Sequence, residues 1–250
     1  MRKLIVNADD FALTASCSMG IVELFKLGIV TSTTILTTGE DFVHSMQLAK
    51  ESGIPLGLHL CLSYGKPILP SEQVSTLVDE KGMFKNIDVL QYEQVDASQV
   101  QAEWLAQLEK LSDEGIRPDH LDSHHYVHEC LGADIRDVAV RLAKQLGIPL
   151  RQGSEDAKDY YINKGIKTTD VFCRDFYGEG VTIGQLKEIL ARPWQGVMEL
   201  MCHPGHVDEK IEQISSYSKG RQRELAVLAS PEIAAYIKEQ NIQLLCFSDL

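Results

Sequence analysis

The sequence predicts an α/β protein built as a TIM-like (β/α) barrel of about seven or eight parallel strands, closed or nearly closed. Short apolar runs alternate with helical patterns along all 250 residues, and such alternation is typical of a parallel sheet. This number of strands in one chain favours a barrel over an open sheet. Neither a GxGxxG motif after the first strand nor a GxxxxGK[ST] motif occurs, which weakens the doubly wound open sheet as the alternative.

The strands are predicted from short runs that are apolar or rich in β-branched residues. Leu4, Ile5 and Val6 form a continuous apolar run, as expected of a strand that is buried on both faces. Threonine and isoleucine dominate the second run, and both residue types are enriched in strands. The predicted strands are 3–7, 30–36, 55–60, 118–123, 148–151, 168–173, 196–202 and 242–247.

Helices are predicted where apolar residues recur every three or four positions. In the segment 97–114, Val100, Trp104 and Leu108 recur at this spacing, and Gly115 follows as a helix-ending residue. The predicted helices are 18–27, 42–51, 97–114, 134–146, 182–191, 220–228 and 231–240, and the segments 64–95 and 152–167 are predicted to be loops.

Charge and length narrow the classes of function. The formal net charge is −12 and the sequence has no basic block. A nucleic-acid partner is therefore not expected, and a small neutral substrate fits better. No run approaches the roughly 18 apolar residues of a membrane span, and the N-terminus turns polar too early for a signal peptide. No repeat or low-complexity linker divides the chain, so residues 1–250 are predicted to form a single domain.

The six cysteines are scattered along the chain and form no CxxC pair. A chain of this length can bury an adequate core without disulfides. We therefore expect reduced, mostly buried thiols in a cytoplasmic protein.

Reactive side chains gather where the predicted strands end. Asp9 and Asp10 follow the first strand, His59 ends the third, and His203 follows 196–202. A histidine-rich run, residues 124–128, follows the fourth strand. Of the eight histidines, only His44 lies away from these strand ends and from residue 120. The carboxyl ends of barrel strands form one rim, and active sites lie at that rim.

Two imidazoles and a carboxylate form a three-ligand site for a divalent ion, with positions left open for water or substrate. A second carboxylate outside the ligand set can take a proton from a bound water, and a histidine across the pocket can protonate a leaving amine. Each residue has a structural alternative. Asp9 and Asp10 could form a turn, and His59 could be a buried, hydrogen-bonded histidine. Their conjunction at one rim favours the metal site.

Five segments of the chain resemble the YdjC-like carbohydrate deacetylases, a family that includes bacterial chitooligosaccharide (chitin disaccharide) deacetylases. The segments occur in order and read IVNADDF (5–11), GIVTSTT (28–34), GLH (57–59), HLDSHH (120–125) and HPG (203–205). The sequence departs from the family at two positions. Tyr126 stands where the family commonly has a third histidine, and Ala12 stands where it commonly has glycine. Neither departure removes a proposed ligand, and Tyr126 bears on substrate contacts.

The resemblance implies a metal-dependent barrel hydrolase that cleaves the linear amide C–N bond of N-acetylated sugars and releases acetate. Asp10, His59 and His124 would hold the metal, Asp9 would be the general base, and His203 would be the general acid. The metal would lower the pKa of a water, from which Asp9 takes a proton. No organic cofactor is expected, and a homodimer is the family's expectation. The family is commonly assigned Mg²⁺, whereas two imidazoles suit Zn²⁺, Co²⁺ or Ni²⁺ better.

Two other classes of function are alternatives. A different metal-dependent barrel enzyme is the first: a sugar isomerase would want more carboxylate ligands and a lysine, and a phosphoesterase would want a second metal and a more basic pocket. A catalytically silent sugar-binding protein is the second, although every proposed catalytic position is filled. The roles of four residues stay open, and aromatic residues are candidates for sugar stacking. The residues whose roles stay open are Tyr126, His125, His128 and Arg151. The candidates for sugar stacking are Tyr126, Phe176, Tyr177 and Trp194.

Overall fold

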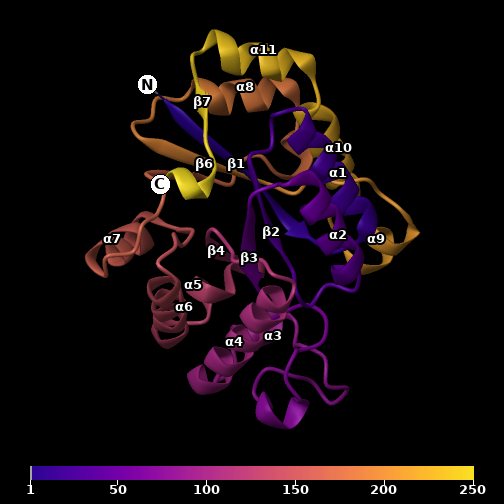
Figure 1. The fold of residues 1–250 in the computed structure, drawn as a ribbon, viewed down its shortest axis with the longest axis vertical. Coiled ribbons are helices and arrows are strands. Elements are labelled where there is room, and N and C mark those ends of the chain that lie inside the picture. The colour runs from indigo at the N-terminus through magenta and orange to yellow at the C-terminus, as the bar shows by residue number, and fades with distance from the viewer. Residues whose placement is uncertain (1) are drawn as a thin grey trace.

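The computed structural model describes residues 2–250, and a parallel sheet forms its centre (Figure 1). The strands are β1 (Lys3–Phe11), β2 (Ser32–Ile35), β3 (Leu56–Leu60), β4 (Leu121–Ser123), β5 (Val171–Cys173), β6 (Val197–Cys202) and β7 (Gln243–Leu244). Six of them pair in the order β4-β3-β2-β1-β6-β5, and β7 pairs with β1. Every pairing between these strands is parallel. The sheet curls into a half-barrel, so the predicted fold class is confirmed in a distorted form.

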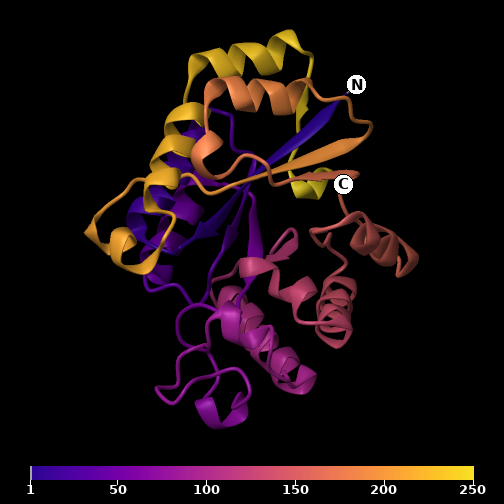
Figure 2. The same ribbon diagram turned by 180° about the vertical axis from the view of Figure 1, so that it is seen from behind.

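Helices surround the curled sheet. They are α1 (Ala15–Lys26), α2 (Phe42–Ser52), α3 (Ile87–Leu90), α4 (Ala97–Asp113), α5 (Val127–Cys130), α6 (Ala133–Leu146), α7 (Glu155–Asn163), α8 (Ile183–Ala191), α9 (Glu209–Ile214), α10 (Ser218–Leu228) and α11 (Pro231–Glu239). Helices α8 and α11 lie side by side at one end of the molecule, and α4 and the segment 64–95 lie at the other (Figure 2). Within residues 2–250, no helix is both long enough and apolar enough to cross a membrane.

The distortion of the barrel lies between its edge strands, β4 and β5. The predicted strand 148–151 is reduced to a single bridge between Leu121 and Leu150. The amide of Leu150 donates to the carbonyl oxygen of Lys167 at 3.0 Å. This irregular segment therefore links β4 to the chain that leads into β5. It also carries Arg151 into the barrel interior.

The loop predicted at 152–167 is wrong, because α7 spans Glu155–Asn163. This helix buries only Ala157 and Tyr161, and its sequence accordingly shows almost no apolar periodicity by which a helix could be predicted. The signal that it does carry is a cap. The Ser154 hydroxyl accepts a hydrogen bond from the Ala157 amide at 3.2 Å, as expected of a serine N-cap.

The remaining differences concern short elements. The predicted strand 242–247 is reduced to the two residues of β7, and a 3₁₀ turn at Phe247–Asp249 follows. The segment 64–95 is mainly irregular, as predicted, apart from a short 3₁₀ turn and α3. Helices α5 and α9 are also short and follow strand ends, where no helix was predicted.

The interior of the barrel is polar. Alternate residues of β1 separate into two environments: Leu4 and Val6 belong to the apolar core between sheet and helices, whereas Asn7 and Asp9 are buried inside the barrel. The Asn7 side-chain amide donates to Asp9 Oδ1 at 2.9 Å. Branched apolar residues usually fill a TIM barrel. Here hydrogen bonds and ion pairs link the buried residues Asn7, Asp9, Thr34, His59, Asp122, Arg151 and Glu199.

Candidate active site

The carboxyl end of β1 contains a bulge that turns two adjacent aspartates towards one cavity. The pairing register of β1 with β2 shifts between Ala8 and Phe11, and Asp10 has a φ of 67°. In a regular strand, successive side chains point to opposite faces. The bulge breaks this alternation, so Asp9 and Asp10 both line a cavity of about 680 Å³.

The structure brings all the predicted site residues together at this cavity. Its lining includes Asp9, Asp10, His59, His124 and His203, which lie at or just after the carboxyl ends of four different strands. His125, Tyr126 and Tyr177 line it as well. Phe176, Trp194 and His128 do not.

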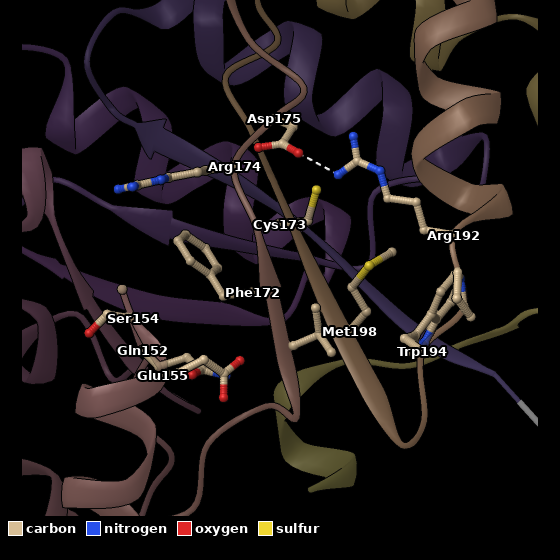
Figure 3. A pocket seen from close by; sticks show the side chains of 13 residues that line it. Gln152, Ser154, Glu155, Phe172, Cys173, Arg174, Asp175, Arg192, Trp194 and Met198 are labelled. Atoms are coloured by element: carbon tan, nitrogen blue, oxygen red, sulfur yellow. Dashed lines mark hydrogen bonds and ion pairs between the residues drawn. The ribbon is translucent and has the colours of Figure 1, made fainter.

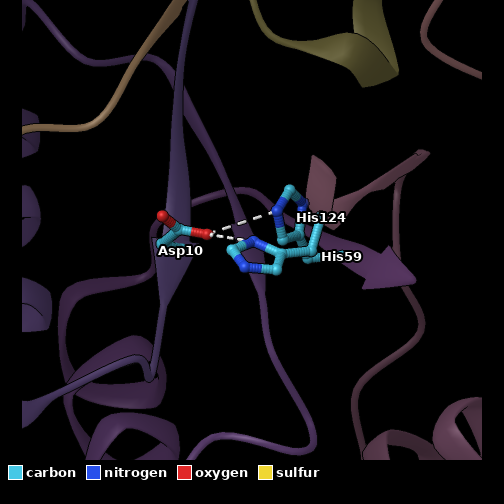
Figure 4. A group of neighbouring side chains, drawn as sticks. All are labelled: Asp10, His59 and His124. Carbon is cyan, nitrogen blue, oxygen red and sulfur yellow. Dashed lines mark hydrogen bonds and ion pairs between the residues drawn. The ribbon is translucent and has the colours of Figure 1, made fainter. Parts of the chain in front are cut away.

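Asp10, His59 and His124 form a compact group. The same oxygen of Asp10, Oδ1, lies 2.9 Å from His124 Nδ1 and 3.4 Å from His59 Nε2. Figure 4 shows both imidazole rings on one side of the Asp10 carboxylate. All three residues are buried, and their candidate ligand atoms lie within 4.8 Å of one another. Two imidazoles and one carboxylate at this spacing fit a divalent metal ion.

The other nitrogen of His59 is held by a carboxylate. His59 Nδ1 lies 2.6 Å from Asp122 Oδ1, and the Thr34 hydroxyl donates to Asp122 Oδ2 at 2.9 Å. Histidine ligands of metals are commonly oriented in this way, with the second nitrogen bonded to a carboxylate. Burial alone would lower the pKa of His59, but Asp122 and Asp10 outweigh it and raise the pKa to about 10. The arrangement leaves His59 Nε2 directed at Asp10.

Arg151 is a fully buried cation surrounded by carboxylates. It donates to both oxygens of Asp9, at 2.5 and 2.6 Å, and to Glu199 Oε1 at 2.6 Å. Its Nη1 also lies 2.8 Å from Asp122 Oδ2. A buried charge is stable only when it is paired and hydrogen-bonded. Arg151 therefore fixes the Asp9 carboxylate and the Asp122 carboxylate behind His59.

A second buried arginine, Arg221 of α10, holds Asp10. Its Nη2 donates to Asp10 Oδ2 at 2.6 Å. Burial would raise the pKa of Asp10, but His124 and Arg221 outweigh it and hold the pKa well below its usual value. Because Arg221 takes one oxygen of Asp10, only Oδ1 faces the two histidines.

His203 lies across the cavity from the histidine pair, and its Nε2 is 4.0 Å from Asp9 Oδ2. Burial lowers the pKa of His203 to about 4, so its ring is neutral at pH 7 in the resting protein. Within residues 2–250 its Nδ1 has no hydrogen-bond partner. The rings of Tyr177 and Tyr217 approach the imidazole edge-to-face, with centroids at 5.7 and 6.1 Å.

The other residues of the histidine-rich run have different surroundings. His128 is buried outside the cavity, where its Nε2 donates to the Arg151 carbonyl oxygen at 3.1 Å. It therefore supports the backbone that carries Arg151. His125 has a φ of 54° and lies at the cavity, with its Nδ1 2.9 Å from the Ser63 hydroxyl. Burial lowers the pKa of His125 to about 3.

Sequence reasoning assigned no role to Asp122, Arg221 or Glu224. Asp122 could have been found, because it lies at the carboxyl end of the predicted strand 118–123, directly before the histidine-rich run. Arg221 and Glu224 lie on a helix remote in sequence from the strand-end residues, and no local pattern marks them. The sequence leaves the role of Arg151 open between a substrate contact and an ion pair, and the structure shows ion pairs.

A second cavity, of about 350 Å³, lies beside β5 (Figure 3). Its lining contains none of the predicted catalytic or metal-binding residues. Arg174 lines both cavities. Figure 3 shows Phe172 and Arg174 on one side of β5 and Cys173 on the other.

Comparison with known proteins gives a consistent family match. The family model described as "YdjC-like protein" matches residues 3–239. A carbohydrate deacetylase of Clostridium beijerinckii is 39% identical over 251 residues, which cover 99% of this chain and 100% of that protein. A carbohydrate deacetylase of Enterococcus faecalis is 38% identical and covers 100% of this chain and 98% of its own length.

Solved structures show the same fold. A provisionally named cellobiose-phosphate cleavage protein of Enterococcus faecalis superposes with a TM-score of 0.93 at 37% identity, covering 99% of this chain and 98% of that one. A family 4 carbohydrate esterase of Streptomyces lividans, solved with acetate, has a TM-score of 0.51 at 10% identity and covers 97% and 91% of the two chains. The second likeness concerns the fold alone.

Proposed function

Because this chain belongs to the YdjC-like protein family, we propose that it is a metal-dependent carbohydrate deacetylase that hydrolyses the acetamide of N-acetylated sugars. The observation that carries the proposal is the juxtaposition of two groups at one cavity. Asp10, His59 and His124 share one oxygen-centred cluster, and Asp9 and His203 face each other beside it. The cluster has the composition of a divalent-metal site, and the pair has that of a base and an acid.

Asp10, His59 and His124 would hold the ion. Such an ion, when bound, lowers the pKa of a water and polarises the acetyl carbonyl. Asp122 and Arg221 keep His59 and Asp10 in the orientation that this requires, through contacts of 2.6 Å each. Two imidazoles favour Zn²⁺, Co²⁺ or Ni²⁺, and the family resemblance favours Mg²⁺, so all four ions are to be compared.

Asp9 is the proposed general base. As the oxygen of water bonds to the acetyl carbon, Asp9 takes a proton from that water. Arg151 holds the carboxylate by two hydrogen bonds, which keeps its direction fixed while the proton is transferred. The Asp9 oxygen nearest His203 lies 4.0 Å from the imidazole.

His203 is the proposed general acid. The C–N bond breaks only if the departing sugar amine gains a proton, because an alkyl amide anion is a poor leaving group. The imidazole is neutral at rest. Negative charge that builds on the acetyl oxygen favours the imidazolium, so His203 takes up the proton that Asp9 removed from the water and donates a proton to the nitrogen, and Asp9 returns to its ionised form. Acetate and the sugar amine are the products.

A neutral N-acetylated sugar such as a chitooligosaccharide is the proposed substrate class. The cavity of about 680 Å³ has room for a small saccharide, and its wall carries the aromatic rings of Tyr64, Tyr126, Tyr177 and Tyr217. Sugar rings pack well on such faces, and their hydroxyls need only neutral or weakly polar partners. A chain of net charge −12 suits an uncharged ligand.

A phosphorylated sugar is the second candidate class. Arg174 lines the cavity, and within residues 2–250 its side chain forms no ion pair; it lies over the Tyr126 ring at 5.9 Å. Arginine is well suited to bind phosphate. The name of the Enterococcus faecalis structure, which concerns cellobiose phosphate, points the same way. In that case Arg174→Gln should raise KM for a phosphorylated substrate and leave KM for the unphosphorylated one nearly unchanged.

Acetate release tests the proposal. The purified protein is stripped of metal and reloaded with Mg²⁺, Zn²⁺, Co²⁺ or Ni²⁺. It is then assayed on N-acetylglucosamine, diacetylchitobiose, longer oligomers and a phosphorylated diacetylated disaccharide. Metal-dependent release of acetate supports deacetylation. Release of phosphate would instead indicate a phosphoesterase, and isomerisation without release of acetate would indicate an isomerase. Binding without any turnover would indicate a sugar-binding protein.

We also propose a homodimer, which the resemblance implies, and a cytoplasmic location, which the scattered cysteines favour. All six cysteines are free, which agrees with a reducing compartment. Light scattering on the purified protein measures the oligomeric state, and fractionation of cells measures the location.

A further inference from the structure

Glu224 of α10 is a buried carboxyl group that the proposed chemistry does not use. It has no exposed surface. Its Oε2 accepts a hydrogen bond from the His203 backbone amide at 2.5 Å, and its Oε1 accepts one from the Tyr217 hydroxyl at 2.6 Å. The buried carboxylates of Asp9, Asp10, Asp122 and Glu199 all have an arginine partner. Within residues 2–250, Glu224 makes no ion pair, so its burial is costly and calls for another explanation.

Tyr217 connects Glu224 to the wall of the cavity. Its hydroxyl accepts a hydrogen bond from the Gly178 amide at 2.9 Å and donates to Glu224. Its ring stacks on Tyr177, with centroids 4.0 Å apart and an interplanar angle of 16°. One hydroxyl therefore ties the segment after β5 to α10, and both rings of the stacked pair meet the edge of His203.

The imidazole of His203 lacks the usual means of orientation. A functional histidine is commonly oriented by a hydrogen bond to its second ring nitrogen, as Asp122 does for His59. His203 Nδ1 is buried and has no such partner among residues 2–250. What holds the residue instead is its backbone, anchored to Glu224, and its ring edge, placed against Tyr177 and Tyr217. The backbone is anchored a second time two residues later, where the Gly205 amide donates to the Arg221 carbonyl oxygen at 3.3 Å.

We propose that Glu224 is a positioning residue that sets the place and orientation of the His203 imidazole, acting through the His203 backbone amide and through Tyr217. The catalytic part of this inference rests on the proposed function, in which His203 protonates the leaving amine. The positioning part concerns only the geometry of the imidazole. It can therefore be tested without turnover.

Two variants test the proposal, each with a matched control. Tyr217→Phe keeps the stacked ring and removes the hydroxyl that joins Gly178 to Glu224. Glu224→Gln keeps one acceptor for the His203 amide and replaces the acceptor of the Tyr217 proton by a donor. The controls are Tyr92→Phe, at a residue that is 85% exposed, and Glu239→Gln, at an exposed position of α11.

The first measurement is the nitrogen NMR spectrum of the imidazoles in ¹⁵N-histidine-labelled protein. The His203 signals are identified by their loss in His203→Ala. We expect both test variants to shift and broaden the His203 signals while the signals of His59 and His124 stay in place. The controls should leave all of them unchanged. His203 signals that are the same in both test variants as in the unaltered protein would overturn the proposal.

The second measurement separates positioning from a general loss of structure. On an N-acetylated sugar, each test variant should lower kcat by about tenfold, the value of one hydrogen bond to a charged or buried group, with a smaller change in KM. On 4-nitrophenyl acetate, whose leaving group needs no proton, the loss should be much smaller. In a His203→Ala background, Glu224→Gln should cause no further loss on the sugar. Equal losses on both substrates, or losses that add in the double variant, would contradict positioning.

The two proposals can fail separately. If the unaltered protein releases no acetate from any N-acetylated sugar, the proposed function fails, and the NMR comparison still decides whether Glu224 and Tyr217 orient His203. If acetate is released but the His203 signals are unchanged in both variants, only the positioning role fails. Tyr217→Phe is expected to fold even if Glu224→Gln does not, because it removes only one hydroxyl from a half-buried residue.

Discussion

Arg151 and Asp9 are joined by two parallel hydrogen bonds, from Nη1 to Oδ2 at 2.5 Å and from Nη2 to Oδ1 at 2.6 Å. The two residues are 142 positions apart in sequence. Such a bidentate pair fixes the plane of the carboxylate as well as its charge. The proposed base therefore cannot turn away from the cavity while His203 and the metal-binding cluster stay in place. The same arginine reaches Asp122 and Glu199, so one cation contacts three buried carboxyl groups.

The first prediction concerns this cation. Arg151→Met leaves several buried carboxylates without their partner and should lower the free energy of unfolding by about 3–5 kcal/mol. Arg192→Ala removes a cation from an exposed pair with Asp175 and should change it by less than about 1 kcal/mol. Urea denaturation of both variants measures this. Similar values for the two would mean that the Arg151 network contributes little to stability.

The second prediction concerns the metal ligands. His59→Ala and His124→Ala each remove one of three proposed ligands, so metal content measured by elemental analysis should fall sharply. Asp122→Asn should weaken metal binding less, by about 10–100-fold, because Asp122 orients His59 and is not one of the three proposed ligands. Circular dichroism checks that the fold persists. Full metal content in either alanine variant would show that the ligand assignment is wrong.

The third prediction separates the two adjacent aspartates. Asp9→Asn keeps the shape of the side chain and removes its basicity, so metal content should stay near normal while turnover falls by roughly 10²–10⁴-fold. Asp10→Asn should lose metal affinity as well, because Asp10 Oδ1 is the oxygen that both histidines approach. Equal loss of metal in the two variants would contradict the division of roles.

The strand ends and their histidines could be predicted from the sequence because periodicity is a local property. His59 and His203 end or follow apolar runs, His124 follows the predicted strand 118–123, and parallel strands place such ends on one rim. The common direction of Asp9 and Asp10 could not be predicted in the same way. It depends on a bulge in β1 and on the φ of 67° at Asp10, neither of which alternation of residue types encodes.

The supporting arginines could not be predicted because their partners are distant. Arg221 is 211 residues from Asp10, and it reaches the site only because α10 packs beside the end of β6. Arg151 enters through the irregular segment that replaces the strand predicted at 148–151. Helix α7 was missed for the opposite reason: it buries two residues, and its stability depends on its cap and its contacts more than on an apolar stripe.

The fourth prediction concerns Gly57, the glycine of the GLH segment. A Cβ on Gly57 would lie 2.3 Å from Cε1 of His120. That imidazole is buried and stacks on Phe247 at 3.6 Å, so it has little room to move. Gly57→Ala should therefore lower the free energy of unfolding by about 1–3 kcal/mol through overpacking. The control is Gly184→Ala in α8, where the nearest atom is 3.8 Å away and the exchange should stabilise the helix slightly. A Gly57 variant as stable as the unaltered protein would show that the His120 side chain can shift to make room for the added Cβ.

The fifth prediction is a pH dependence of stability that arises from Glu224. Burial raises the pKa of this carboxyl group from 4.5 to about 8. Between these two values the folded chain keeps a proton that the unfolded chain has lost, so the contribution of Glu224 to stability falls as the pH rises through this window and becomes level above it. Glu224→Gln cannot ionise. The difference in unfolding free energy, unaltered protein minus variant, should therefore decrease from about pH 5 to about pH 8, as measured by urea denaturation, while Glu239→Gln shows no such trend. A difference that is constant or that increases with pH would mean that Glu224 is ionised in the folded protein, stabilised by its two hydrogen bonds.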